Sequence, residues 1–220
     1  MNEPHRQYSA LISGATGLVG EQLLTLLLND PAYAMVIAVV RKPMEMNHAK
    51  LQQVVTGFEK LPAAMEGLSA DHGYCCLGTT IKTAGSKEKQ YIIDHDYVVA
   101  FAAGCQKAGV TRFAVVSSIG ANAGSSNFYL RTKGEMERDI IKIPFQAIFI
   151  MQPSFLLGER KEFRAGEKTA ISVMKVLNSF MVGPLKKYRG VRVKAVANVM
   201  INQVKSGKQG VTFIRSDVIS

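Results

Sequence analysis

The segment from Tyr8 to Leu28 constrains the fold of this chain more than any other part. Apolar residues lead into a turn that holds Gly14, Gly17 and Gly20, and leucines follow the turn at helical spacing. In a strand, glycine turn and helix of this kind, the first glycine turns the chain sharply and the second lets the backbone approach a pyrophosphate. The third allows close packing of helix on sheet. The free amides of the first helical turn then face the phosphates.

The residues after Gly20 distinguish two kinds of phosphate-binding turn. A mononucleotide turn requires Gly-x-x-x-x-Gly-Lys-Ser/Thr, but Glu21 and Gln22 follow the third glycine here. The sequence therefore predicts a dinucleotide-binding turn. The alternative is a strand-to-helix turn that binds nothing.

Apolar strands and amphipathic helices alternate along the rest of the chain, which predicts a doubly wound α/β sheet of the Rossmann type. We expect the strand order 3-2-1-4-5-6 with a short last strand. Strands are expected at 8–12, 35–40, 51–58, 73–77, 112–117, 145–151 and 211–214, and helices at 18–28, 61–68, 91–108, 128–141, 167–181 and 193–204.

The length of 220 residues suits one domain, residues 1–220, in which 155–220 contribute a small cap on the substrate side. No apolar run reaches the roughly 18 residues of a membrane span. A charged N-terminal tail with Pro4 does not resemble a secretory signal. The chain is therefore expected to be cytoplasmic and without a membrane span.

The three cysteines and four histidines show no spacing typical of a metal site or a disulfide framework. We therefore expect no metal, and interpret the adjacent Cys75 and Cys76 as small core residues.

Positive charge is concentrated in residues 151–220, which hold 13 of the 27 basic residues but only 4 of the 17 acidic ones. Such a bias suits a phosphorylated cofactor, an anionic substrate, an acidic protein partner or nucleic acid, and equally a solvated surface. Nucleic-acid binding is disfavoured, because no recognition motif or interleaved aromatic pattern accompanies the charge.

Arg41 and Lys42 follow the predicted second strand, at the place where a dinucleotide fold holds the adenosine ribose. A carboxylate there binds the 2′-hydroxyl of NAD, whereas cations accommodate the 2′-phosphate of NADP. Two cations without a carboxylate favour NADP. Gly78 and Thr79 follow the fourth strand and are expected to contact the cofactor at the same sheet edge.

Tyr129 and Lys133 lie four residues apart on one face of a predicted helix, so they are expected to be neighbours. A tyrosine with an ordinary pKa near 10 must have it lowered by about 3 to exchange protons at pH 7, and a nearby ammonium acts in that direction. Ser117 and Ser118 end the fifth strand at the same edge of the sheet. Either hydroxyl is a candidate to hold a substrate oxygen that Tyr129 protonates.

Five segments together resemble the atypical short-chain dehydrogenase/reductases, most of all their Tat-interacting-protein-like subgroup. The resemblance covers about residues 10–167. Its segments are Gly-Ala-Thr-Gly-Leu-Val-Gly, Cys-Cys-Leu-Gly-Thr-Thr, Ser-Ser-x-Gly-Ala, Ser-Ser-Asn-Phe-Tyr and Tyr-x-x-x-Lys. One departure is Gln152-Pro153-Ser154, where close relatives often have Arg-Pro.

The resemblance implies an NADPH-dependent reductase of small carbonyl compounds, with Tyr129 as proton donor, Lys133 on the ribose and Ser118 as the preferred catalytic serine. Some members of this group are instead NADPH-responsive regulators or partners of other proteins, and that alternative remains open. The implied cofactor contacts are Gly14, Thr16, Gly17, Leu18, Val19, Arg41, Lys42, Leu77, Gly78, Thr79, Tyr129, Lys133, Leu156 and Arg164.

Overall fold

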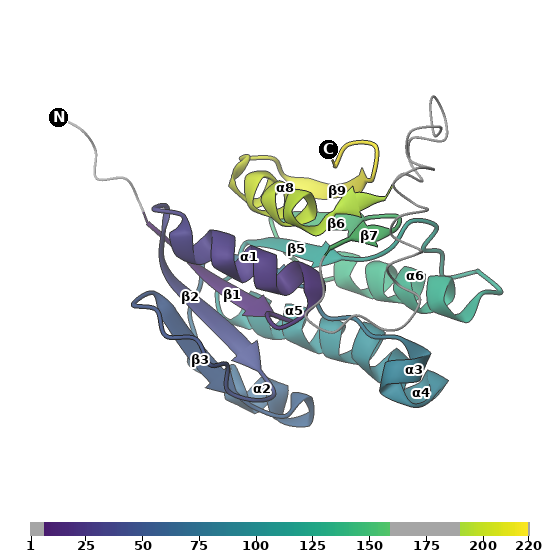
Figure 1. Ribbon diagram of the computed structural model, residues 1–220, viewed down its shortest axis with the longest axis horizontal. Coiled ribbons are helices and arrows are strands. Elements are labelled where there is room, and N and C mark those ends of the chain that lie inside the picture. Colours follow the sequence, from purple (N-terminus) through teal and green to yellow (C-terminus); the bar gives the residue numbers. More distant parts are fainter. Residues whose placement is uncertain (1–6, 159–189, 220) are drawn as a thin grey trace.

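Seven parallel strands form the central sheet of the protein (Figure 1). The structure is a computed structural model and describes residues 7–158 and 190–219. The order of the strands across the sheet is β3-β2-β1-β4-β5-β6-β9, which confirms the predicted Rossmann topology. The strands are β1 (Tyr8–Ser13), β2 (Tyr33–Val40), β3 (Leu51–Val55), β4 (His72–Cys75), β5 (Arg112–Val116), β6 (Ala147–Gln152) and β9 (Gly210–Arg215).

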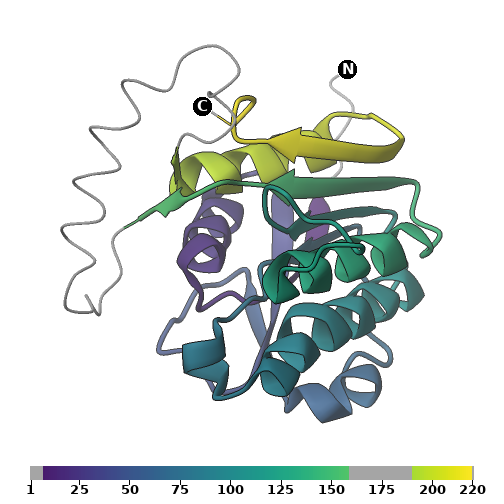
Figure 2. The same ribbon diagram turned by 90° about the vertical axis from the view of Figure 1, so that its right-hand side faces the viewer.

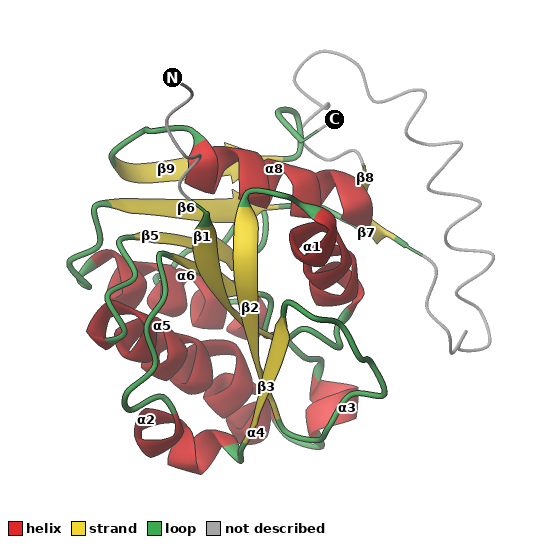
Figure 3. Ribbon diagram, turned by 90° about the vertical axis from the view of Figure 1, so that its left-hand side faces the viewer, coloured by secondary structure: helices red, strands yellow, loops and turns green. Residues whose placement is uncertain are grey.

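Helices cover both faces of this sheet (Figure 3). On one face lie α1 (Leu18–Asn29) and α8 (Val193–Lys205), which pack against each other. The main helices on the other face are α5 (Tyr97–Lys107) and α6 (Phe128–Ile141). The shorter helical segments are η1 (Phe58–Lys60), α2 (Leu61–Ala64), α3 (Ile81–Ala84), α4 (Lys87–Tyr91) and η2 (Ile92–Asp96).

Two apolar cores result, one on each face of the sheet. Successive side chains of a strand point to opposite faces, so Ala10 and Ile12 of β1 join the core under α1 and α8, while Leu11 joins the core under α5 and α6. Strands buried on both faces read as continuous apolar runs, as the sequence of β2 does. Because the sheet is buried on both faces, the carboxyl ends of its strands have fixed positions. The candidate site lies at these ends.

Several predicted boundaries differ from the structure for local reasons. The expected helix at 91–108 is divided, because the π turn η2 separates α4 from α5. The expected strand at 51–58 ends at Val55, since Phe58 begins a 3-10 turn and buries its ring in the core with α5. The last strand is longer than expected and runs from Gly210 to Arg215.

Most of the described residues in 155–220 belong either to the central sheet or to the helices that cover it. Figure 2 shows β9 in yellow at the sheet edge beside β6. A separate two-stranded sheet joins β7 (Leu156–Leu157) to β8 (Val191–Arg192). The predicted helix at 167–181 and Arg164 lie outside the described residues. Among the residues that are described, no helix is long and apolar enough to cross a membrane.

Candidate functional site

The glycine turn joins β1 to α1 by very close backbone packing. Gly14 has a φ of +78°, and a Cβ on it would lie 2.5 Å from the carbonyl carbon of Cys76. A Cβ on Gly20 would overlap the carbonyl oxygen of Gly14. α1 therefore begins directly behind the turn, at Leu18, and its N-cap Gly17 has no side chain to occupy the first amides. Those amides are available to an anion.

A cavity of about 540 Å³, here named the inner cavity, lies in front of this helix end. Its wall is formed by the start of α1, the loop after β4, α3, η2, the end of β5, α6 and β7. Its lining residues include Thr16, Gly17, Leu18, Val19, Cys76, Leu77, Gly78, Thr79, Asp94, Ser117, Tyr129, Lys133 and Leu156. The structure thus brings together ten of the predicted cofactor contacts.

A second cavity of about 860 Å³, the outer cavity, lies between the start of α1 and the loop after β2. Arg41 and Lys42 line it, and Thr16 and Glu21 line both cavities. The Arg41 guanidinium lies 5.9 Å from the centre of the Phe58 ring, a cation–π contact that holds it beside the cavity. Glu45 also lines this cavity, so its wall carries carboxylates as well as cations.

Lys133 of α6 is almost fully buried and forms an ion pair inside the inner cavity. Its Nζ lies 2.7 Å from Oδ1 of Asp94, which is supplied by the π turn η2. The other carboxylate oxygen of Asp94 accepts a hydrogen bond from the Thr79 amide at 3.2 Å. The carboxylate therefore connects the predicted catalytic lysine to the loop after β4.

This environment changes the pKa of Lys133 in two opposing ways. Burial lowers it, because the charged form loses its hydration, while the charge and hydrogen bond of Asp94 and the nearby Tyr129 raise it. The net result is a pKa above the ordinary 10.5, so Lys133 is a cation at neutral pH. Its charge is balanced at contact distance by Asp94.

The two candidate serines are placed differently. Ser117 is 4% exposed and lines the inner cavity, next to Val116 at the end of β5. Its hydroxyl lies near the Glu137 carboxylate but forms no hydrogen bond of ordinary geometry within the described residues. The Ser118 hydroxyl donates instead to the carbonyl of Ile119 at 3.4 Å, and Ser118 does not line the cavity formed by the described residues.

A second carboxylate, Glu137, is buried one helical turn beyond Lys133. Gln152 of β6 donates its side-chain amide to both oxygens of Glu137, at 3.0 and 3.2 Å. Burial raises the pKa of Glu137 above its ordinary value, against the opposing effects of this hydrogen bond and of the Lys133 charge. A neutral amide thus satisfies this buried acid.

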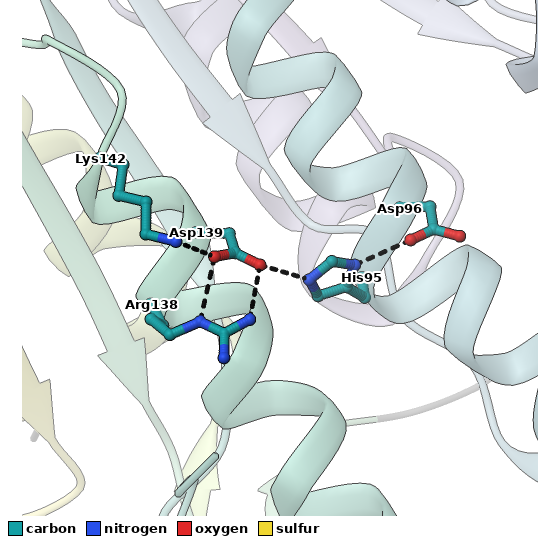
Figure 4. A network of polar contacts seen from close by, with 5 residues as sticks. All are labelled: His95, Asp96, Arg138, Asp139 and Lys142. Atoms are coloured by element: carbon teal, nitrogen blue, oxygen red, sulfur yellow. Dashed lines mark hydrogen bonds and ion pairs between the residues drawn. The ribbon is translucent and has the colours of Figure 1, made fainter.

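The outer side of η2 is also fastened to α6, through the network in Figure 4. His95 contacts Asp96 through Nδ1 at 2.8 Å and Asp139 of α6 through Nε2 at 3.1 Å. Hydrogen bonds from Arg138 and Lys142 hold the pKa of Asp139 well below its usual range. The π turn is therefore joined to α6 on both sides, by Asp94 within and by His95 at the surface.

Sequence reasoning identified the glycine turn, the cations after β2 and the Tyr129–Lys133 pair, but missed Asp94 and Glu137. A signal for Asp94 exists in the helical spacing: it shares a face with Val98, Phe101 and Cys105, all buried. An acid on an otherwise apolar face requires a partner. No group of three or more His, Cys, Asp or Glu that could hold a metal ion is present in 7–158 and 190–219.

Comparisons with known proteins agree with this geometry. A family model described as NAD(P)H-binding matches residues 14–206. The chain is 35% identical over 193 residues to "Protein FMP52-1, mitochondrial" of Scheffersomyces stipitis, covering 86% of this chain and 81% of that protein. It is 34% identical over 163 residues to "Protein HTATIP2" of Rattus norvegicus, covering 72% and 67% of the two chains.

The fold alone is also shared with the Bordetella bronchiseptica enzyme WbmG, solved in complex with NAD. Its TM-score is 0.71 at 13% sequence identity, over 98% of this chain and 74% of that one.

The expected cytoplasmic location is wrong. FMP52 relatives from four organisms, at 31–38% identity, are named mitochondrial proteins. The expectation depended on the lack of a long apolar run, which argues against membrane spans and secretory signals. Mitochondrial targeting segments are amphipathic, so that observation carries no information about them.

Proposed function

Because this chain belongs to the NAD(P)H-binding family, among the atypical short-chain dehydrogenase/reductases related to HTATIP2 and FMP52, we propose that it reduces a small carbonyl compound with NADPH. One observation carries the proposal: Tyr129 and Lys133 line the same cavity as the free amides of α1. A cofactor seated on those amides therefore lies within reach of a proton donor.

The residues that hold the cofactor follow from the two cavities. The pyrophosphate belongs at the N-terminus of α1, where the amides and the helix dipole favour an anion. The adenosine extends into the outer cavity, and Arg41 and Lys42 are the cations available to its 2′-phosphate. The loop after β4, with Leu77, Gly78 and Thr79, then lies along the inner half of the cofactor together with Leu156.

NADPH, when bound, supplies the hydride. Tyr129 gives its phenolic proton to the oxygen of the carbonyl compound as that oxygen gains negative charge. A serine hydroxyl at the end of β5 holds the same oxygen; Ser117 is favoured by its place in the cavity wall and Ser118 by the family pattern. Lys133 keeps its ammonium beside the cavity and is available to the cofactor ribose.

The first test is turnover. Purified protein is incubated with NADPH and a panel of aldehydes, ketones and quinones, and cofactor consumption is followed by its absorbance. The proposal expects consumption with at least one carbonyl class, at a rate that depends on protein concentration. If the protein binds NADPH but consumes none across the panel, a cofactor-dependent regulatory or interaction protein is the better description.

A further inference from the structure

We propose that Asp94 is a positioning residue of this site, which fixes Lys133 against the loop after β4 and cancels its charge beside Tyr129. This inference rests on the proposed function, because it assigns Asp94 a part in the same reaction. Asp94 reaches the chemistry through Lys133 and Thr79, and its carboxylate is 1% exposed.

The two oxygens of Asp94 have different partners, which fixes the carboxylate in one orientation. Oδ1 pairs with Lys133 Nζ at 2.7 Å and Oδ2 accepts from the Thr79 amide at 3.2 Å. The loop passes directly over the ion pair, since a Cβ on Gly78 would lie 3.3 Å from Asp94 Oδ1 and 3.7 Å from Lys133 Nζ. A side chain at Gly78 would therefore crowd the pair. The ammonium has a defined position as a result.

The helix that carries Asp94 also holds the loop from its other side. Gln90, at the end of α4, donates its side-chain amide to the Thr79 carbonyl at 3.1 Å. Thr79 is thus bound through both its N–H and its C=O by one helical segment. His95 fastens this segment to α6 through Asp139. Displacement of η2 would therefore move the loop and Lys133 together.

Among the described residues, five ionisable groups meet around this ion pair. Lys133 faces Asp94 of η2, Tyr129 and Glu137 of α6, and Cys75 of β4. Burial raises the pKa of Cys75 to about 12, so this thiol stays neutral at physiological pH. Asp94 is the acid in direct contact with Lys133. Removing its charge leaves a buried ammonium without that partner, which favours loss of the proton.

The test compares Asp94→Asn with a matched control, Asp96→Asn, two residues along the same π turn. Asparagine keeps the shape of the side chain and removes its charge, whereas Asp96 is half exposed and contacts His95 instead. The pH dependence of kcat/KM for NADPH consumption is measured for both and for the wild type. Asp94→Asn should lower the pKa of Lys133. The alkaline limb of the profile, where kcat/KM falls at high pH, should therefore shift to lower pH by about 1–3 units. Asp96→Asn should follow the wild type.

A second readout separates this inference from the proposed function. NADPH affinity is measured by fluorescence titration at pH 7 and pH 9, and Asp94→Asn should lose affinity between them while the wild type changes little. If no variant turns over but this loss is seen, the reductase proposal fails and the role of Asp94 stands. If Asp94→Asn has the same pH profile of kcat/KM and the same NADPH affinities as the wild type, the inference is overturned, even if the variant is less stable.

Two further variants complete the test. Asp94→Glu keeps the charge, and where it folds it should restore the wild-type alkaline limb even if kcat falls. A limb that remains shifted in this variant would contradict the charge argument. If Asp94→Asn is recovered unfolded, Asp94→Ser replaces it, because its small side chain leaves room for water beside Lys133. The same shift is expected, and its absence would overturn the inference.

Discussion

The two ends of the candidate site use positive charge in opposite ways. At the outer cavity, Arg41 and Lys42 are exposed, and Arg41 is held by the face of Phe58. At the inner cavity, Lys133 is 3% exposed and paired with Asp94. Within the part of the chain that the structure describes, the outer cations have no ion-pair partner and can contact a phosphate, whereas the inner ammonium is already paired with a carboxylate.

Burial and pairing determine what each cation can contribute to the site. An exposed charge attracts an anion through solvent, and its effect weakens with salt. A buried, paired charge is screened little by salt and acts only on groups close to it, so its contribution depends on the fixed position of its hydrogen-bond donors. We therefore expect substitutions at the inner end to change stability and turnover, and substitutions at the outer end to change cofactor choice.

The largest effect on stability is expected from Lys133→Ala. It leaves the Asp94 carboxylate buried without its ion-pair partner, and breaking such a pair typically costs about 3–5 kcal/mol. Denaturant titration should show the loss, together with weaker NADPH binding. Lys142→Ala, at the C-cap of the same helix, is the control, because Lys142 is exposed and contacts the surface acid Asp139. Similar stability losses in both variants would remove the distinction between the buried and exposed cations.

The next largest effect is expected on the preference between NADPH and NADH when Arg41 is substituted. The wild type is expected to prefer NADPH to NADH, and Arg41→Asp should reduce NADPH affinity by at least about tenfold, because a charge-assisted contact to the 2′-phosphate is lost. NADH affinity should change little. Calorimetric titration of both cofactors checks this. Since Glu21 and Glu45 also line the outer cavity, equal affinities in the wild type would mean that these carboxylates offset the cations.

The smallest effect concerns Glu137 and depends on pH. Its pKa is raised above the ordinary 4.5 in the folded protein, so folding favours its protonated form. That contribution to stability is fully present below the unfolded-state pKa and is lost as the pH rises through the folded-state value. Glu137→Gln carries no such titration, so its stability relative to the wild type should increase from pH 4 to pH 8.

Denaturant titrations at several pH values measure this difference. Glu135→Gln, on the same helix but outside the buried cluster, controls for loss of a carboxylate from α6. A relative stability of Glu137→Gln that does not change with pH, or that falls as the pH rises, would contradict the assignment of a buried acid with a raised pKa.

Local patterns predicted the outer end of the site better than the inner end. The glycine turn and the cations after β2 are each encoded within a few consecutive residues, and strand order follows from the α/β alternation. The ion pair of Lys133 joins residues 39 positions apart, and it depends on the π turn that brings Asp94 inward. Spacing along the chain placed Lys133 beside Tyr129 and did not indicate that an acid would neutralise it.

For a related reason, the sequence did not indicate which of Ser117 and Ser118 enters the cavity. Two adjacent residues at a strand end point in different directions, and the turn that follows β5 decides which one enters the cavity. The family pattern favoured Ser118, whereas the cavity wall contains Ser117. Serine-to-alanine variants at both positions remain the means of assigning the role.

The most direct test of the central proposal is the kinetics of Tyr129→Phe with NADPH and a carbonyl compound that the wild type reduces. The substitution removes the phenolic hydroxyl from the inner cavity and leaves the ring in place. Turnover should fall by roughly 100-fold or more, the usual scale of general acid catalysis, while NADPH affinity stays close to the wild-type value. Unchanged turnover, or a change in NADPH affinity alone, would contradict the proposal that Tyr129 is the proton donor of a reductase.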